Sequence, residues 1–414
     1  MKTIIGIKRN IRWALELCIL VVLTVACVLF AQPIAQEAYV LLPPHQIVVK
    51  QAISQRTDRF EEALSFIAPG WPGKDKDKII DASKTYHTLE RSLELELGPI
   101  EIRENENFDQ ATRVVVPTLS EKVKNLSTGK VFVRPDHKIL DFLLEKQQTP
   151  EGQQWRLISY FDPNYAEIES TWLKLPRKKI PGSPKIILKK AILMQVVSDD
   201  GKIASENKIL FDEKIENKLK AVVLAPHQIA AKQKIYLLMD RYEETLSFFA
   251  AGWPGKDRDK IIEAWKKLHT LRQSLELELG PLEIREDETF DQATRLVVPV
   301  LSEKAKILST GKVSVLPDHR LGDLLLEKQQ TPEGQRWRII SPFDPNYAEI
   351  ESTWLKLPRK KVPGSPRIIL KKAILMQVVS DDGKIVGEKT ILFDEKIGNI
   401  EIAPTSEVDR QKSK

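Results

Sequence analysis

The chain has 414 residues, of which 42% are hydrophobic and 29% charged, and its formal net charge is +6. This composition excludes a disordered chain, and the length exceeds that of one ordinary hydrophobic core, so two domains are predicted. The small net charge gives no sign of a nucleic-acid partner, and the only cysteines, Cys18 and Cys27, lie near the N-terminus, which excludes disulfides and thiolate metal sites in the rest of the chain.

Residues 1–36 are interpreted as a targeting or anchoring segment. An apolar run from Leu17 to Ala31 follows four basic residues, and no basic residue comes after it before Lys50. This asymmetry predicts a cytoplasmic N-terminus and an extracytoplasmic remainder. The run is intermediate in length between a signal-peptide core and a spanning helix. The sequence therefore predicts a single-pass membrane anchor, or a secreted protein if the segment is cleaved as a signal peptide, and a third interpretation is acylation of Cys27.

The rest of the chain is an internal duplication. A shift of 182 residues superposes Pro43–Ile215 on Ala225–Ile397 without a gap, with 132 identities in 173 positions. The 19 residues FDPNYAEIESTWLKLPRKK at 161–179 recur unchanged. The two copies must therefore share one fold. We predict tandem repeat domains at 41–216 and 223–398, which pack on each other because the connection is short, and a polar tail at 399–414.

Each repeat opens with two amphipathic patterns. Apolar residues up to Ile67 recur at spacings of three and four, which predicts a helix that begins near His45. After a break rich in Pro and Gly, a second stripe from Ile79 to Leu93 predicts a helix that ends at Gly98. The end of this stripe also alternates with period two, so an earlier helix end followed by a strand stays open. The two helices would form an antiparallel hairpin.

Later in the repeat the patterns are mixed. Short strands are predicted at Val131–Val133 and Trp155–Phe161, with a helix at His137–Gln147 between them. Ile186–Val197 is rich in β-favouring residues and ends at Asp-Asp-Gly, so Lys202–Phe211 is expected to return beside it as a hairpin. The predicted fold class is thus α+β, with two tandem near-identical domains, each a helical hairpin plus a small antiparallel sheet, behind the N-terminal transmembrane or signal segment.

No motif of a known catalytic class is present. The fingerprints GxSxG, GxGxxG and HExxH do not occur in the sequence. Tyr165 and Trp172 have helical spacing and are interpreted as a packed face. The six histidines, three per repeat, lack zinc-site spacing, so neither a metal nor another cofactor is expected. An enzyme is not favoured, and the alternative is an exported hydrolase whose site combines His137, Asp162 and Glu167.

A basic stretch closes the recurring block. Its prolines, Pro176, Pro181 and Pro184, predict an extended loop that displays cations. Two such loops on one chain predict bivalent contact with an anionic surface, namely lipid headgroups, an acidic polysaccharide or an acidic protein. A solvated loop without a partner is the competing interpretation. The candidate residues are Lys174, Arg177, Lys178, Lys179 and Lys185, with Lys356, Arg359, Lys360, Lys361 and Arg367 in the copy.

The sequence thus favours a tandem-repeat binding or interaction protein outside the cytoplasm, tethered to a membrane or exported. A further alternative is a structural scaffold in which the two repeats form a pseudo-dimer, because two copies of one fold in a chain resemble a homodimer. Nucleic acid is not an expected partner.

Overall fold

The computed structural model describes residues 41–68, 76–135, 141–150, 152–159, 162, 164–213, 225–250, 257–317, 322–332, 334–341, 344 and 346–396. These residues all lie in one compact unit of the chain. The predictions for residues 1–36 and for the tail at 399–414 lie outside the described residues. Within the residues described here, no helix is both long and apolar enough to cross a bilayer.

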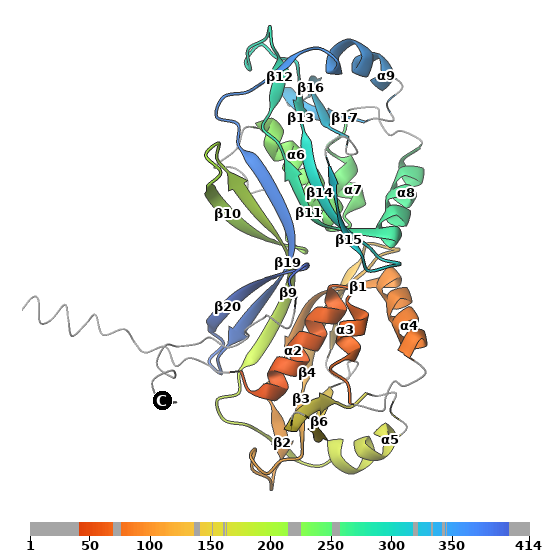
Figure 1. Cartoon of the computed structure of the whole chain (residues 1–414), viewed down its shortest axis with the longest axis vertical. Helices are drawn as coiled ribbons and strands as arrows, with labels where there is room; N and C mark the ends of the chain where they lie inside the picture. The colour runs from red at the N-terminus through yellow and green to blue at the C-terminus, as the bar shows by residue number, and fades with distance from the viewer. Residues whose placement is uncertain are drawn as a thin grey trace, which may run out of the picture. The chain divides into compact units, whose positions relative to one another are not determined.

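Helices and strands follow the same order in the two repeats (Figure 1). The helices of repeat 1 are α2 (Pro43–Arg56), α3 (Phe60–Leu64), α4 (Lys76–Leu89), α5 (Tyr165–Ile168) and the π-helical turn η3 (Glu169–Leu173). Its strands are β1 (Glu90–Leu97), β2 (Glu101–Arg103), β3 (Arg113–Val116), β4 (Thr118–Asn125), β5 (Val131–Pro135), β6 (Phe142–Thr149), β7 (Gly152–Leu157), β8 (Arg177–Lys179), β9 (Lys185–Val197) and β10 (Ile203–Leu210).

Repeat 2 reproduces these elements 182 residues later. Its helices are α6 (Ala225–Leu238), α7 (Tyr242–Leu246), α8 (Arg258–Leu271), α9 (Tyr347–Ile350) and the π-helical turn η7 (Glu351–Leu355). Its strands are β11 (Arg272–Leu279), β12 (Glu283–Arg285), β13 (Arg295–Val298), β14 (Val300–Ile307), β15 (Val313–Pro317), β16 (Leu324–Thr331), β17 (Gly334–Ile340), β18 (Arg359–Lys361), β19 (Arg367–Val379) and β20 (Ile385–Leu392).

One antiparallel sheet of ten strands runs through both repeats. Its order is β15-β14-β11-β19-β9-β1-β4-β5, with β10 paired to β9 and β20 paired to β19. Strands β9 and β19 pair along their whole length, and Ala191 lies opposite Ala373. These alanines are equivalent positions of the two repeats, so the pairing creates a local pseudo-twofold axis between them. Figure 1 shows β9 and β19 at the centre, where the two repeats meet.

Each repeat also has a five-stranded antiparallel sheet of its own. The orders are β7-β6-β3-β2-β8 and β17-β16-β13-β12-β18, so the basic strands β8 and β18 form sheet edges. In repeat 1, Val115 and Leu143 of this sheet pack against Tyr165 and Trp172. The interpretation of these two aromatic residues as a packed face is therefore confirmed, because both are buried.

The predicted fold class is wrong. The described residues are dominated by antiparallel strands in three sheets, one shared by the two repeats and one in each repeat, and neither repeat is a helical hairpin with a small sheet beside it. The predicted hairpin of β9 and β10 and the predicted strand at Val131–Val133, which is part of β5, are confirmed. The ten-stranded sheet was not foreseen because pairing between distant segments leaves no local periodic signal.

Two segments that were predicted as helices are strands in the structure. Helix α4 ends at Leu89, and the predicted last turns of this helix are strand β1. Leu93, Leu95 and Leu97 are buried there, whereas Glu94 pairs with a lysine on the opposite face. The alternation of buried and partly exposed side chains therefore follows the two-residue period of a strand and not the 3.6-residue period of a helix. The predicted helix at 137–147 is also wrong in its described part, because β6 pairs with β3 and β7 as the central strand of three.

Candidate functional site

Two aspartates occupy equivalent tight turns, one in each repeat. Asp58 joins α2 to α3 with φ of 57°, and Asp240 joins α6 to α7 with φ of 56°. This left-handed conformation is uncommon outside glycine, and aspartate tolerates it better than most residues. The side chain of Asp58 is 13% exposed and that of Asp240 is 2% exposed. A buried carboxylate requires partners, and both turns supply them.

Each aspartate contacts a histidine in the last turn of the second helix after it, α4 in repeat 1 and α8 in repeat 2. The Nδ1 atom of His87 lies 2.7 Å from Oδ1 of Asp58, and Nδ1 of His269 lies 2.6 Å from Oδ1 of Asp240. Ionised carboxylates only accept hydrogen bonds, so Nδ1 donates and Nε2 is left as the other ring nitrogen in each pair. Such pairing fixes the orientation of the imidazole ring.

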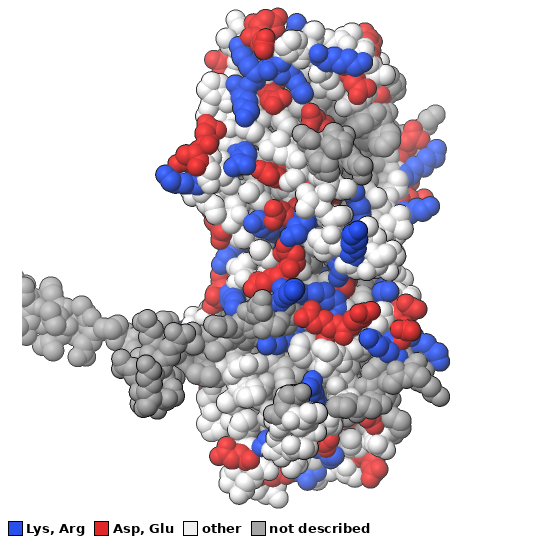
Figure 2. Space-filling model, in the orientation of Figure 1, with Lys and Arg blue, Asp and Glu red and all other residues white. Residues whose placement is uncertain are grey.

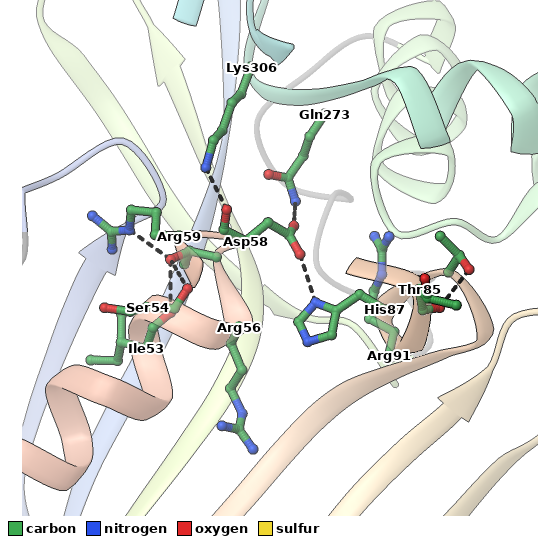
Figure 3. A network of polar contacts seen from close by, with 12 residues as sticks. Ile53, Ser54, Arg56, Asp58, Arg59, Thr85, His87, Arg91, Gln273 and Lys306 are labelled. Atoms are coloured by element: carbon green, nitrogen blue, oxygen red, sulfur yellow. Dashed lines mark hydrogen bonds and ion pairs between the residues drawn. The ribbon is translucent and has the colours of Figure 1, made fainter. Parts of the chain in front are cut away.

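The second carboxylate oxygen is bound by the other repeat. Gln273 Nε2 donates to Asp58 Oδ2 at 2.8 Å, as Figure 3 shows, and Arg91 forms an ion pair with Asp240. Gln273 and Arg91 are equivalent positions, so one half of the site has a neutral donor where the other has a cation. Tyr242 adds an asymmetry, because its hydroxyl donates to Asp240 Oδ1 at 3.1 Å and its counterpart is a phenylalanine.

The turns are also bound through their main chain. Lys306 Nζ donates to the carbonyl oxygen of Asp58 at 2.8 Å (Figure 3), and Lys124 Nζ donates to that of Asp240 at 2.9 Å. Each lysine comes from the opposite repeat. The two turns are therefore fixed by reciprocal contacts across the pseudo-twofold axis.

The electrostatics of this region keep the aspartates ionised. Burial alone would raise the pKa of Asp58, but the hydrogen bond and charge of His87, with the charges of Lys190 and Arg91, hold that pKa well below its usual range. Burial would likewise raise the pKa of Asp240, which Arg91 and His269 hold well below its usual range. Both aspartates are thus anionic at neutral pH.

Two buried lysines lie at the centre of the same sheet. Burial lowers the pKa of Lys190 in β9 to about 7 and that of Lys372 in β19 to about 8. The two residues are 4% and 3% exposed. Lysine rarely occurs this deep in a protein without a carboxylate partner. In the part of the chain that the structure describes, neither ammonium group forms an ion pair.

A cavity of about 430 Å³ lies between the two turns, and we call it the inter-repeat cavity. Both histidines, Tyr242 and Lys372 line it, but Lys190 does not. Cationic side chains outnumber acidic ones among its described lining residues. They are Lys84, Arg91, Lys266, Arg272 and Lys372, against Asp58 and Asp240.

This arrangement suits binding of an anion. The two carboxylates are bound by histidine, glutamine or arginine, and the buried Lys372 lines the cavity without a salt-bridge contact among the described residues. Charge-assisted hydrogen bonds in a poorly hydrated cavity are stronger than those at the surface. Among the described residues no group of three or more His, Cys, Asp and Glu side chains is placed to hold a metal ion.

The basic residues predicted from sequence lie elsewhere, and several have internal partners. Arg177 of β8 pairs with Glu101 at 3.3 Å, and Lys185 pairs with Glu96 at 2.6 Å. Lys174, Lys178 and Lys179 are exposed. The prolines predicted an extended loop, whereas the segment at 177–179 is an edge strand that pairs with β2.

The copy repeats this pattern. Arg359 pairs with Glu283 at 3.5 Å, and Arg367 pairs with Glu278 at 2.8 Å. Lys360 donates to a backbone carbonyl at 2.7 Å, and Lys356 and Lys361 are exposed. Basic and acidic side chains are interspersed over the face that Figure 2 shows. The structure thus brings none of the ten predicted residues into the inter-repeat cavity.

The residues of the alternative hydrolase site are not brought together there either. Asp162 and Glu167 do not line the inter-repeat cavity, and Glu167 is exposed on α5. His137 lies outside the described residues.

Sequence reasoning missed the aspartates, although one signal was available. Only four of the ten positions in Gln51–Phe60 match the copy, and Asp58 and Arg59 are two of them. The acidic residue kept in this divergent segment is the signal that points to the turn.

Searches of this chain against models of known protein families and against curated proteins give no match.

Proposed function

We propose that this protein is a binding protein whose inter-repeat cavity takes a small organic or inorganic anion. The observation that carries the proposal is Lys372, a buried lysine that lines the cavity and has no ion-pair partner among the described residues. A bound anion would supply the missing partner. The excess of cationic lining residues also favours a negatively charged ligand.

The size of the cavity limits the ligand. A volume of about 430 Å³ falls at the lower end of the range for small-molecule sites. Arg91 and Tyr242 would orient the ligand from one side, because their contacts to Asp240 hold them in place. A compact di- or tricarboxylate or a phosphate fits this description better than a polymer.

Calorimetric titration of the full-length chain with citrate and with inorganic phosphate tests the proposal. We expect saturable binding with one site per chain, and an affinity at least tenfold weaker in the Lys372→Met variant. The matched control is Lys190→Met, which removes an equally buried lysine that does not line the cavity. Because the pKa of Lys372 is about 8, affinity should fall as the pH rises above that value. Absence of saturable binding, or equal losses in the two variants, would contradict the proposal.

The exposed lysines of the edge strands support a second candidate function. Lys178 and Lys179 in β8 and Lys361 in β18 are exposed, and they could contact an anionic surface as the sequence predicts. Their replacement by glutamine, with binding to anionic vesicles measured at two salt concentrations, tests this function. Binding that the replacement leaves unchanged would exclude it.

The place of action is also part of the proposal. The charge asymmetry around the apolar run at 17–31 supports a membrane tether with the repeats outside the cytoplasm. A protease added to intact cells should digest the repeats if they lie there, and their full protection would contradict this location.

A further inference from the structure

A second cavity lies inside repeat 1, and we call it the repeat 1 cavity. Its volume is about 670 Å³, and its described lining comes from α2, α3, α4 and strands of both sheets of that repeat. Most of the wall is apolar, with Leu64, Ile79 and Phe142 among its residues. The volume matches that of sites for drug-sized molecules.

The lining residues of the repeat 1 cavity can be compared with the equivalent residues of repeat 2. Six lining positions are polar in the repeat 1 cavity and apolar in repeat 2, although both repeats share one fold. The pairs are Gln55 and Leu237, Arg56 and Leu238, Ser83 and Trp265, Tyr86 and Leu268, Thr118 and Val300, and Arg134 and Leu316. A difference of this kind, repeated at six lining positions, is not needed to build the fold.

Large side chains occupy the equivalent region of repeat 2. Trp265 packs against the main apolar core, with ring centroids 6.3 Å from those of both Tyr242 and Phe249. In repeat 1 the counterparts of Trp265 and Phe249 are Ser83 and Ile67, which are smaller and line the cavity. One repeat thus has a packed core where the other has space.

The polar end of the repeat 1 cavity is formed by two arginines around one glutamate. Arg56 Nη2 donates to Glu121 Oε1 at 3.1 Å, and Arg134 Nη1 donates to Glu121 Oε2 at 3.1 Å. Arg56 is only 6% exposed, yet its Nε atom has no hydrogen-bond partner. A buried donor without an acceptor costs about 1–3 kcal/mol, so an occupant that supplies an acceptor would be stabilising.

We propose that the repeat 1 cavity is a binding site for an amphipathic small molecule, with an apolar chain along the α2, α3 and α4 wall and an oxygen-bearing head group at Arg56. This site differs in ligand chemistry from the inter-repeat cavity, whose described lining has five cationic side chains and few aliphatic ones. Repeat 2 lacks both the head-group arginine and the space left by Ser83, so one ligand per chain is expected.

Titration of the full-length chain with sodium decanoate, as a simple amphipathic carboxylate, tests the site. We expect one saturable site, and binding at least tenfold weaker in the double variant Ser83→Trp, Ile67→Phe, which introduces the two side chains of repeat 2. The matched control is Thr85→Lys, which also copies repeat 2 but changes an exposed residue of α4 outside the cavity lining. It should bind decanoate like the parent chain.

A second variant tests the site without introducing large side chains. Arg56→Lys retains the cation beside Glu121 but removes the Nε donor, and we expect decanoate binding to weaken at least fivefold. Citrate or phosphate binding should not change in any of these variants, so failure of this site is distinguishable from failure of the inter-repeat site. No saturable decanoate binding in the parent, or unchanged affinity in both the filled and the Arg56→Lys variants, would overturn the proposal.

Discussion

The residues around Asp58 and Asp240 show that a buried carboxylate keeps a partner in both copies of a duplication. Both aspartates keep a histidine partner, but the contact from the opposite repeat is Gln273 for Asp58 and Arg91 for Asp240. The glutamates nearby follow the same rule. Glu121 is bound by Arg56 and Arg134, whereas the equivalent Glu303 is bound by Arg272. The carboxylates are the same in both repeats whereas their partners differ, because an unpaired buried carboxylate is costly and each must keep some partner.

This rule gives a prediction for Arg91. Its replacement by alanine leaves Asp240 with His269 and Tyr242 alone, and we expect a loss of about 3 kcal/mol in the free energy of unfolding. The Arg91→Gln variant should lose clearly less, because Gln273 shows that an amide in this position donates to the aspartate. Urea unfolding of the two variants measures the difference. Equal losses would show that the contact across the repeats contributes little.

A buried histidine near the start of α2 makes stability depend on pH. His45 Nε2 lies 3.1 Å from the carbonyl oxygen of Gly98, and burial lowers the pKa of His45 to about 4. The unfolded chain takes up a proton near pH 6.5 and the folded chain resists until about pH 4. Stability should therefore fall as the pH drops through this window, by up to about 3 kcal/mol.

Unfolding at pH 7 and pH 5 checks this dependence. The His45→Gln variant, whose amide can still donate to Gly98 but does not titrate, should lose less stability between these two values than the parent chain. His227 contributes the same kind of dependence in repeat 2. An identical pH slope in the parent and in the variant would exclude His45 as a source.

At the scale of elements, the sequence predicted best where a pattern was local. The β9 and β10 hairpin follows from a β-rich run and an Asp-Asp-Gly turn, and the structure has both strands. In contrast, β6 was mistaken for a helix because its pairing with β3, about thirty residues earlier, decides its conformation. The inter-repeat site was beyond prediction for the same reason, since its parts come from distant segments of two repeats.

The edge strands give a prediction of their own. An unpaired sheet edge can recruit another chain, and exposed lysines are a common protection against this. Replacing Lys178 and Lys179 by valine should therefore increase self-association, which light scattering over a range of protein concentrations would detect. Lys202→Val serves as the control, because Lys202 is 84% exposed in a turn away from this edge. No difference between the variants would mean that these lysines have another role.

At the scale of the molecule, the two repeats are joined by more than their connecting segment. The β9 and β19 pairing is supported by side chains that cross between repeats, including Lys208 with Glu388 at 2.6 Å and the two lysines bound to the aspartate turns. We therefore expect both repeats to unfold in one calorimetric transition. Two separate transitions, each with the heat of one repeat, would contradict this expectation.

The pseudo-twofold axis at Ala191 and Ala373 has a consequence for how this protein could change over time. In a homodimer built on such an axis, every substitution appears on both sides at once, so both halves of a central site must accept the same residue. Here each half is encoded separately. That freedom allows tyrosine in one half where the equivalent residue of the other is phenylalanine, and arginine where the equivalent residue is glutamine. It also allows a cavity in repeat 1 at positions where large side chains pack against the core in repeat 2.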